Sequence, residues 1–280
     1  MNAETRIVTD TTAPPTADTD DVEVLGPPPR ARSIEWLVRL ASVVLVIGSW
    51  EVLGRQVDPL FMSYPSAIAT AALALIKSGE LGEALWSSLQ TLVIGFTTAS
   101  IIGLVLGLLI GRYKLVDAAT DWLVNALYST PLVAILPLVI LWFGLGDMAK
   151  LFIVTLLAVF PVLINTAAGV RNVPAHLIDV GSAFAANERQ VFLKIILPAT
   201  MPYMMTGLRL GIGRAIIGMV VAEFFTAITG LGAMIVKYGN QYDTASMFVP
   251  ILMLMLLGVG LTILVRKAED YFAPWRAGGE

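Results

Sequence analysis

The feature that most constrains this chain is a series of long apolar runs, separated by shorter polar stretches. Six runs occur, at about 34–53, 85–110, 122–143, 151–168, 203–228 and 247–265. An α-helix needs about 20 mainly apolar residues to cross a bilayer, and runs of this length are too long for the strands of a membrane barrel. Because lipid offers the backbone no hydrogen-bond partners, such spans fold as helices. The sequence therefore predicts an all-α, polytopic membrane bundle of about six transmembrane helices.

Composition agrees with this class and excludes several functions. Hydrophobic residues make up 57% of the 280 residues and charged residues only 14%, whereas a soluble domain usually has about 25% charged residues. The net charge of −3 gives no basic excess for nucleic acid. There is no cysteine, and the single histidine, His176, cannot form a histidine cluster alone. We therefore expect no metal site and no catalytic residue, since paired carboxylates and nucleophile constellations are also missing from the sequence.

The chain divides into a tail and a membrane domain. Residues 1–29 are acidic and rich in threonine and proline. A segment of this composition cannot bury enough apolar surface to offset the entropy of ordering, so we expect it to be disordered. The membrane domain covers 30–280.

Basic residues orient the bundle. If the amino terminus is cytoplasmic, 14 of the 18 lysines and arginines count as inside, or 11 when the tail and the two arginines of the fifth apolar run are left out. Four lie outside: Arg55, Lys77, Lys150 and Lys237. Cytoplasmic loops of membrane proteins carry such an excess. With an even number of spans, both termini are then cytoplasmic, and so is the longest polar break, at about 169–202.

This cytoplasmic loop has the pattern of an amphipathic helix. Pro174 suits a first helical turn. Leu177, Val180 and Phe184 supply an apolar face, and Asp179 lies on a polar one. A short amphipathic helix beside a membrane domain suggests docking to a cytoplasmic partner.

The loop resembles the EAA loop of type I ABC importer permeases. In that family a Glu-Ala-Ala sequence is followed by a glycine and, later, by Ile-x-Leu-Pro. Here Asp179 stands in place of the glutamate and Ala185 in place of the glycine, while Ile195, Leu197 and Pro198 match at the expected spacing. The start of the motif is degenerate and its end is clear.

Two further stretches resemble the nitrate/sulfonate/taurine branch of these permeases. They are 131–146, which runs from Pro131 to Gly146, and 221–232, which contains Glu223. The whole resemblance covers about 34–275. It implies a type I ABC importer permease fold with a cytoplasmic coupling helix, placed in the cell (inner) membrane.

The resemblance also implies partners and a function. Family members pair as two permeases with two ABC ATPase subunits and a periplasmic or lipid-anchored solute-binding protein. This chain would form the translocation pathway for a small solute, such as a sulfonate, taurine or nitrate, as part of a permease homodimer surrounded by membrane lipid. The sequence lacks a G-x-x-x-x-G-K-[ST] loop. We therefore expect no cofactor on this chain, with ATP used by the partner subunits.

Two sets of residues are candidates for these roles. For docking to the ATPase we expect Asp179, Gly181, Phe184, Ala185, Glu188 and Arg189. For the translocation pathway the candidates are Asn125, Tyr128, Ser129, Pro131, Pro137, Asn165, Arg214 and Glu223. The two prolines would break or kink the third span, and ionisable residues inside spans suggest function because their burial is costly. The plainer alternatives are a packing kink for the prolines, a structural pairing for Glu223 and a bridge between helices for Asn165. Arg214 lies either within the membrane, where it would attract an anion, or at the inner interface, which the distribution of basic residues favours.

A self-contained secondary transporter or channel is the main alternative function. It predicts charged residues near the centres of spans and an internal repeat. The sequence has few such charges and no obvious repeat.

Overall fold

A computed structural model of the chain describes residues 29–226 and 228–272, which form helices joined by short connections. Apart from Pro29, the acidic tail predicted over 1–29 lies outside the described residues. Internal contacts divide the chain into two units, Met1–Ser49 and Trp50–Glu280. The first helix, α1 (Pro29–Gly54), begins in the first unit and ends in the second.

The number of long apolar helices agrees with the predicted membrane bundle. Four stretches are long and apolar enough to span a bilayer: Trp36–Gly54 of α1, α3 (Glu80–Arg112), α6 (Asp147–Arg171) and Thr244–Lys267 of α11 (Thr244–Phe272). Two bent pairs raise the total to six if each pair is one span. In the first pair, α4 (Lys114–Ser129) is followed by η1 (Leu132–Ile135) and α5 (Leu136–Phe143). In the second pair, a long stretch is followed by α10 (Leu231–Asn240). That stretch consists of α8 (Glu188–Val191), η2 (Phe192–Ile196) and α9 (Leu197–Thr226).

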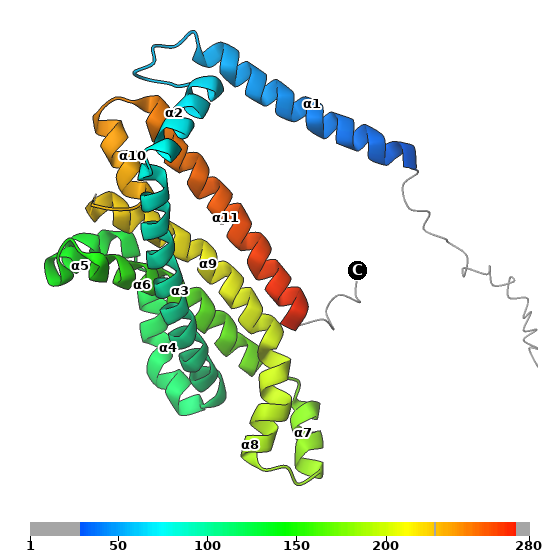
Figure 1. Ribbon diagram of the computed structural model, residues 1–280. Coiled ribbons are helices and arrows are strands. Elements are labelled where there is room, and N and C mark those ends of the chain that lie inside the picture. Colours follow the sequence, from blue (N-terminus) through cyan, green and yellow to red (C-terminus); the bar gives the residue numbers. More distant parts are fainter. Residues whose placement is uncertain (1–28, 227, 273–280) are drawn as a thin grey trace, which may run out of the picture. The chain divides into compact units, whose positions relative to one another are not determined.

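Helices α3 and α6 pack closely along their length (Figure 1) because small residues recur every four positions on α3. A Cβ added to Gly103 would lie 2.8 Å from the Cβ of Val162, and one added to Gly107 would lie 2.6 Å from the Cβ of Thr166. Gly111 is in the same relation to Val170. Glycine lets two helix backbones approach where any larger residue would separate them. The structure thus uses this stripe of glycines within the chain, against α6.

Helix α9 also packs closely on α6, on a face next to the one that α3 uses. A Cβ on Gly211 would lie 2.8 Å from Val162 Cγ2, and one on Gly207 would lie 3.1 Å from Asn165 Cβ. By contrast, a Cβ on Gly213 would meet nothing within 4 Å. One face of α9 is therefore packed inside this unit, and another is left open.

Helix α9 begins at Leu197, earlier than the start near Tyr203 that hydropathy suggested. Pro198 lies in its first turn, where a missing N–H costs little, and Pro202 lies inside it. A π-helical turn, η2, leads directly into α9. Hydropathy cannot place such a boundary, because polar and apolar residues alternate through this region.

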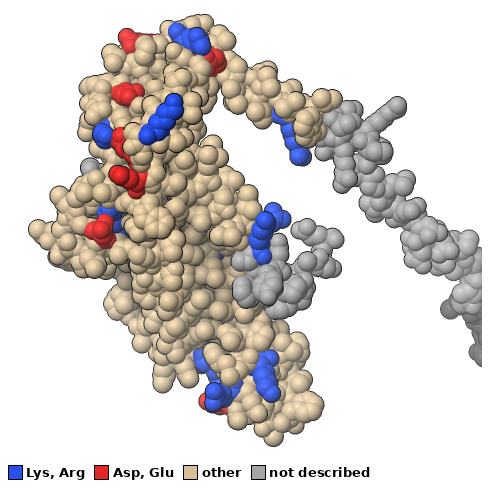
Figure 2. Space-filling model, in the orientation of Figure 1, with Lys and Arg blue, Asp and Glu red and all other residues tan. Residues whose placement is uncertain are grey.

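A cluster of buried hydrophobic side chains lies at the end of the unit opposite the α6–α9 loop (Figure 1). It joins α2 (Pro65–Lys77), the start of α3, α10 and α11, and it is built on Leu75, Leu81, Leu231 and Tyr238. In the view of Figure 2, the charged side chains of this unit lie mainly toward its two ends.

Candidate functional site

The loop between α6 and α9 is helical, as its sequence predicts, but it forms two short helices and not one. Helix α7 covers Ala175–Ala183, and α8 begins at Glu188. A capping box starts α8: the Asn187 side chain accepts a hydrogen bond from the Gln190 N–H, and the Gln190 side chain accepts one from the Asn187 N–H, both at 2.9 Å. This reciprocal pair satisfies two of the amides that a helix start leaves unpaired.

Gly181 holds α7 against the turn that leads into α9. It is the buried residue of α7, and a Cβ placed on it would lie 2.8 Å from Ile195 Cδ1 and 3.4 Å from Val191 Cγ2. A methyl group would displace the end of the Ile195 side chain, and a bulky side chain would push α7 away from η2. Gly181 therefore serves the internal packing of the loop, and the predicted contact of this residue with an ATPase remains a prediction.

The other predicted docking residues lie at the surface. The Phe184 side chain is 83% exposed, and Asp179, Ala185 and Glu188 are exposed as well. Ala185 has φ +51°, in the left-handed region that an alanine rarely adopts. A glycine would fit this turn without that penalty, which gives a physical reason for the glycine of the related motif.

Glu188 and Arg189 lie on the side of the loop that faces the end of α3. A cavity of about 450 Å³ lies there, lined by both residues and by Arg112. The Arg112 guanidinium is 3.9 Å from the Glu188 carboxylate, a long ion pair. The docking residues thus fall on two surfaces: Phe184 and Asp179 on α7 and the turn after it, and Arg189 beside α3.

The third predicted span is broken at Pro131, and its two halves meet at 86°. Thr130 is the last residue before the break, and its N–H still bonds to the Ala126 carbonyl at 3.1 Å. Pro137 was expected to interrupt a helix, but it lies in the first turn of α5, where proline is well accommodated. Pro131 alone therefore accounts for the bend.

The polar residues before this break lie on the open surface of α4. Asn125, Tyr128 and Ser129 are all exposed. Asn125 lines a small cavity of about 90 Å³ between α3, α4 and α6. The Tyr128 ring lies 6.2 Å from that of Phe160 on α6. These residues share one helix, and the predicted pathway role of each stays a prediction.

Two further candidates differ in their surroundings. The Asn165 side chain donates a hydrogen bond to the Pro161 carbonyl, 2.8 Å away within the same helix. Arg214 is exposed on α9, and no hydrogen bond or ion pair joins it to another residue in the described part of the chain. An arginine deep in a span without such a partner is costly, so it is a candidate for function.

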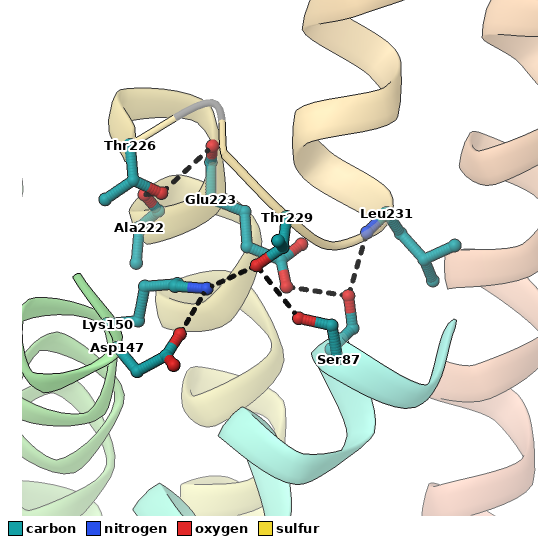
Figure 3. A network of polar contacts seen from close by, with 9 residues as sticks. Ser87, Asp147, Lys150, Ala222, Glu223, Thr226, Thr229 and Leu231 are labelled. Atoms are coloured by element: carbon teal, nitrogen blue, oxygen red, sulfur yellow. Dashed lines mark hydrogen bonds and ion pairs between the residues drawn. The ribbon is translucent and has the colours of Figure 1, made fainter. Parts of the chain in front are cut away.

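Glu223 is fully buried near the end of α9 and holds the start of α10 (Figure 3). Its Oε1 accepts a hydrogen bond from the Ser88 hydroxyl at 2.6 Å, and its Oε2 accepts one from the Gly232 N–H at 2.8 Å. Ser88 Oγ in turn accepts a bond from the Leu231 N–H at 2.8 Å. The first amides of a helix favour a carboxylate, because they are unpaired and lie at the positive end of the helix dipole.

The glycine at the start of this turn is required by the carboxylate. Gly230 has φ +106°, and a Cβ on it would overlap the Glu223 carboxylate. The positive φ and the close approach both restrict this position to glycine. Residues 223 and 230–232 therefore act as one unit that fixes α10 against α3.

Lys150 lies buried beside this site in a second set of polar contacts, and the sequence did not reveal its burial. Only 1% of the Lys150 side chain is exposed, and its Nζ lies 2.8 Å from Asp147 Oδ1. The same Nζ donates a hydrogen bond to Thr229 Oγ1, also at 2.8 Å. Ser87 donates to the same Thr229 oxygen at 3.0 Å. Charge counting treated Lys150 as an exposed outer cation. The one feature of the sequence that could have indicated a partner for Lys150 is Asp147, which lies three residues earlier on the same helix face.

Within 29–226 and 228–272, no group of three or more His, Asp or Glu side chains is placed to hold a metal ion. The polar groups that the structure brings together thus form a structural network at one end of the bundle. The loop at the other end presents an exposed helix.

Comparison with known proteins gives the family. Residues 99–274 match the sequence pattern of the family described as "Binding-protein-dependent transport system inner membrane component". The chain is 32% identical over 258 residues to the "Putative aliphatic sulfonates transport permease protein SsuC" of Bacillus subtilis (strain 168), covering 91% of this chain and 94% of that protein. It is 35% identical over 188 residues to the "Nitrate import permease protein NrtB" of Leptolyngbya laminosa, covering 67% of each.

The fold is shared with a solved importer. An inward-facing structure of the MetNI methionine ABC transporter superposes with a TM-score of 0.56 at 19% identity, covering 70% of this chain and 97% of that one. The family match covers more than half of the 280 residues, and the SsuC match extends over most of the chain. This chain belongs to the binding-protein-dependent transport inner-membrane component family, the permease subunits of ABC importers.

Proposed function

We propose that this permease takes up a small anion, as a homodimer served by two ATPase subunits and a periplasmic or lipid-anchored solute-binding protein. Relatives named for aliphatic sulfonates and for nitrate support an anionic solute, because both solutes carry a negative charge. This chain binds no ATP itself, and ATP is used by the partner ATPase subunits. A sulfonate, taurine or nitrate is the expected solute.

The observation that carries the proposal is Arg214. It lies 12 residues before the end of α9, or about 18 Å along a helix that rises about 1.5 Å per residue. If Thr226 is near one boundary of a hydrocarbon core about 30 Å thick, Arg214 lies close to its centre. A cation at that depth attracts an anion strongly, because the low dielectric weakens the attraction little.

The surroundings of Arg214 support a role at an open surface between two copies. Leu210 and Ile217 lie on the same face of α9 and are about half exposed, at 52% and 50%. Gly213 has open space around its Cα. This stripe is not packed inside the chain, so a second copy and the solute pathway are proposed to cover it. A homodimer would bring one Arg214 from each copy to the pathway.

The distribution of charge supports the proposed orientation, with both termini cytoplasmic. The end of the bundle with α7 and α8 carries Arg112, Lys114, Arg171, Arg189 and Lys194. The opposite end carries Glu80, Glu83 and Asp147 beside its lysines. An excess of lysine and arginine marks the cytoplasmic side. The exposed face of α7 and Phe184 would then be accessible to a cytoplasmic ATPase.

Transport in vesicles tests the role of Arg214. The chain is reconstituted with its ATPase and binding protein, and uptake of a sulfonate and of nitrate is measured at several concentrations. Arg214→Gln should weaken transport of the anion by about 10-fold or more, since a hydrogen bond to a charged group contributes about 1.5–3 kcal/mol. Arg266→Gln removes an exposed charge from the end of α11 and serves as the control. Anion uptake by Arg214→Gln that equals that of the control would refute the role of Arg214.

A further inference from the structure

A cavity at the cytoplasmic end of α3 has a composition that the transport pathway does not explain. It lies between the last turn of α3 and the segment formed by α8 and η2, and it has a volume of about 450 Å³. Leu108, Leu109 and Phe192 make its apolar part, while Arg112, Arg189 and Tyr113 make its polar part. Glu188 is the one acidic residue in the lining.

The two arginines of this cavity are available to a ligand. The side chain of Arg112 is 34% exposed, and its contact with Glu188, at 3.9 Å, is too long for a hydrogen bond. The Glu188 side chain is 90% exposed, so it is free to turn toward water. Arg189 is exposed and forms no ion pair within the described ranges. The lining therefore has two guanidinium groups and one weakly engaged carboxylate.

The position of the cavity along the membrane selects one kind of ligand. Arg112 ends the apolar span of α3, and Tyr113, which follows it, is 52% exposed. Arginine and tyrosine at the end of a span lie at the level of the lipid headgroups. Leu109, one turn earlier on the same helix, is 41% exposed and continues the apolar part toward the acyl chains. A free phosphate would use only the arginines and would leave the apolar part of the cavity unused.

We propose that this cavity binds one anionic phospholipid of the cytoplasmic leaflet. Its phosphate lies between Arg112 and Arg189, and the first part of its acyl chain lies against Leu109 and Phe192. Basic pockets between helices on the cytoplasmic side are known to bind anionic headgroups. The lipid would join the end of α3 to the segment that leads from the coupling loop into α9. This inference uses the proposed orientation to name the leaflet, but the binding itself does not depend on the solute. Because Arg189 is also a candidate for docking the ATPase, the binding is tested on the permease without that partner.

Native mass spectrometry of the purified full chain in detergent tests the binding. Phosphatidylglycerol and phosphatidylcholine with identical acyl chains are titrated separately, and the affinity of the tightest site is measured for each. We expect phosphatidylglycerol to bind more tightly. Each basic residue near a membrane surface contributes about a fivefold factor, so Arg112→Gln/Arg189→Gln should weaken phosphatidylglycerol binding by about 30-fold. The charge-preserving pair Arg112→Lys/Arg189→Lys should retain most of the affinity.

A matched control separates this cavity from a general effect of charge. Lys114→Gln/Lys194→Gln removes the same two charges from the same end of the bundle, at exposed residues outside the cavity lining. It should leave the tightest site unchanged. If the double arginine variant fails to fold, each single glutamine variant carries the test, with an expected loss of about fivefold.

Three results would overturn the proposal. Equal binding of phosphatidylcholine would show that the cavity does not recognise the headgroup charge. An equal loss in the lysine control would show that only the overall charge matters. Displacement of the lipid by millimolar inorganic phosphate would show an anion site that does not need the acyl chain. None of these results bears on anion uptake, which the Arg214 experiment tests separately.

Discussion

The strongest structural prediction concerns Glu223, which we expect to hold the start of α10 in place. Its carboxylate is fully buried and accepts bonds from Ser88 Oγ at 2.6 Å and from the Gly232 N–H at 2.8 Å. A hydrogen bond to a charged group contributes about 1.5–3 kcal/mol to stability. Glu223→Ala removes two such bonds, and the sum lies at roughly 3–6 kcal/mol. Because water can enter and neighbouring groups can relax, we expect the lower end, about 3 kcal/mol.

Hydrogen exchange of the peptide that covers 229–234 measures this effect directly. A loss of about 3 kcal/mol in the local opening free energy corresponds to about 100-fold faster exchange of the Leu231 and Gly232 amides. Glu223→Gln keeps one carbonyl oxygen but places an NH₂ group against a donor. The Leu231 and Gly232 amides of this variant should therefore exchange at a rate between those of the unchanged chain and of Glu223→Ala. Glu83→Gln is the control, since it removes an exposed carboxylate near the same end of α3. Unchanged exchange in Glu223→Ala would refute the proposed role of this carboxylate.

Three other predictions follow from local geometry. Ala185→Gly should raise stability by about 1 kcal/mol, because Ala185 has φ +51°, and a lower thermal midpoint would contradict this. Gly107→Leu should separate α3 from α6 and lower the thermal midpoint, since even a Cβ there would lie 2.6 Å from Thr166 Cβ, whereas Gly213→Ala should not destabilise the chain; equal losses would refute the packing assignment. Gly181→Trp should abolish coupling of ATP hydrolysis to uptake while leaving membrane insertion intact, because it displaces α7 from Ile195, and normal coupled uptake would contradict a mechanical role for α7.

The sequence predicted the all-helical class and the apolar runs, because the mean hydropathy of a segment depends only on its own residues. The structure has four stretches long and apolar enough to span a bilayer, or six if each bent pair is one span. The sequence also predicted the break at Pro131, since proline removes a backbone donor wherever it lies. The angle of 86° at that break could not be predicted, because it depends on how the short helices that follow pack against α6. For the same reason Pro137 was misjudged: its cost depends on whether it lies inside a helix or in its first turn.

The contacts between spans were beyond reach of the sequence. The glycines every four residues on α3 indicated close packing, but their partner is α6 of the same chain and not a second subunit. Lys150 looked like an exposed cation because its neighbours in sequence are polar or lie at a helix start. Its burial depends on Thr229, which is 79 residues away. A structural pairing of Glu223 was one of the alternatives, yet its partners, Ser88 and Gly232, come from other helices and are not evident from the sequence.

The most direct test of the account is the side of the membrane on which α7 and the turn after it lie. The chain has no cysteine, so a single cysteine reports one position without background. Phe184→Cys places it at an 83% exposed residue of the coupling loop, and Phe61→Cys places the control at an 80% exposed residue at the other end of the bundle. With a membrane-impermeant maleimide, Phe184→Cys should react only in inside-out vesicles, and Phe61→Cys only in right-side-out vesicles. Reaction of Phe184→Cys from the outer side would contradict the account, because a cytoplasmic ATPase could not then reach the loop.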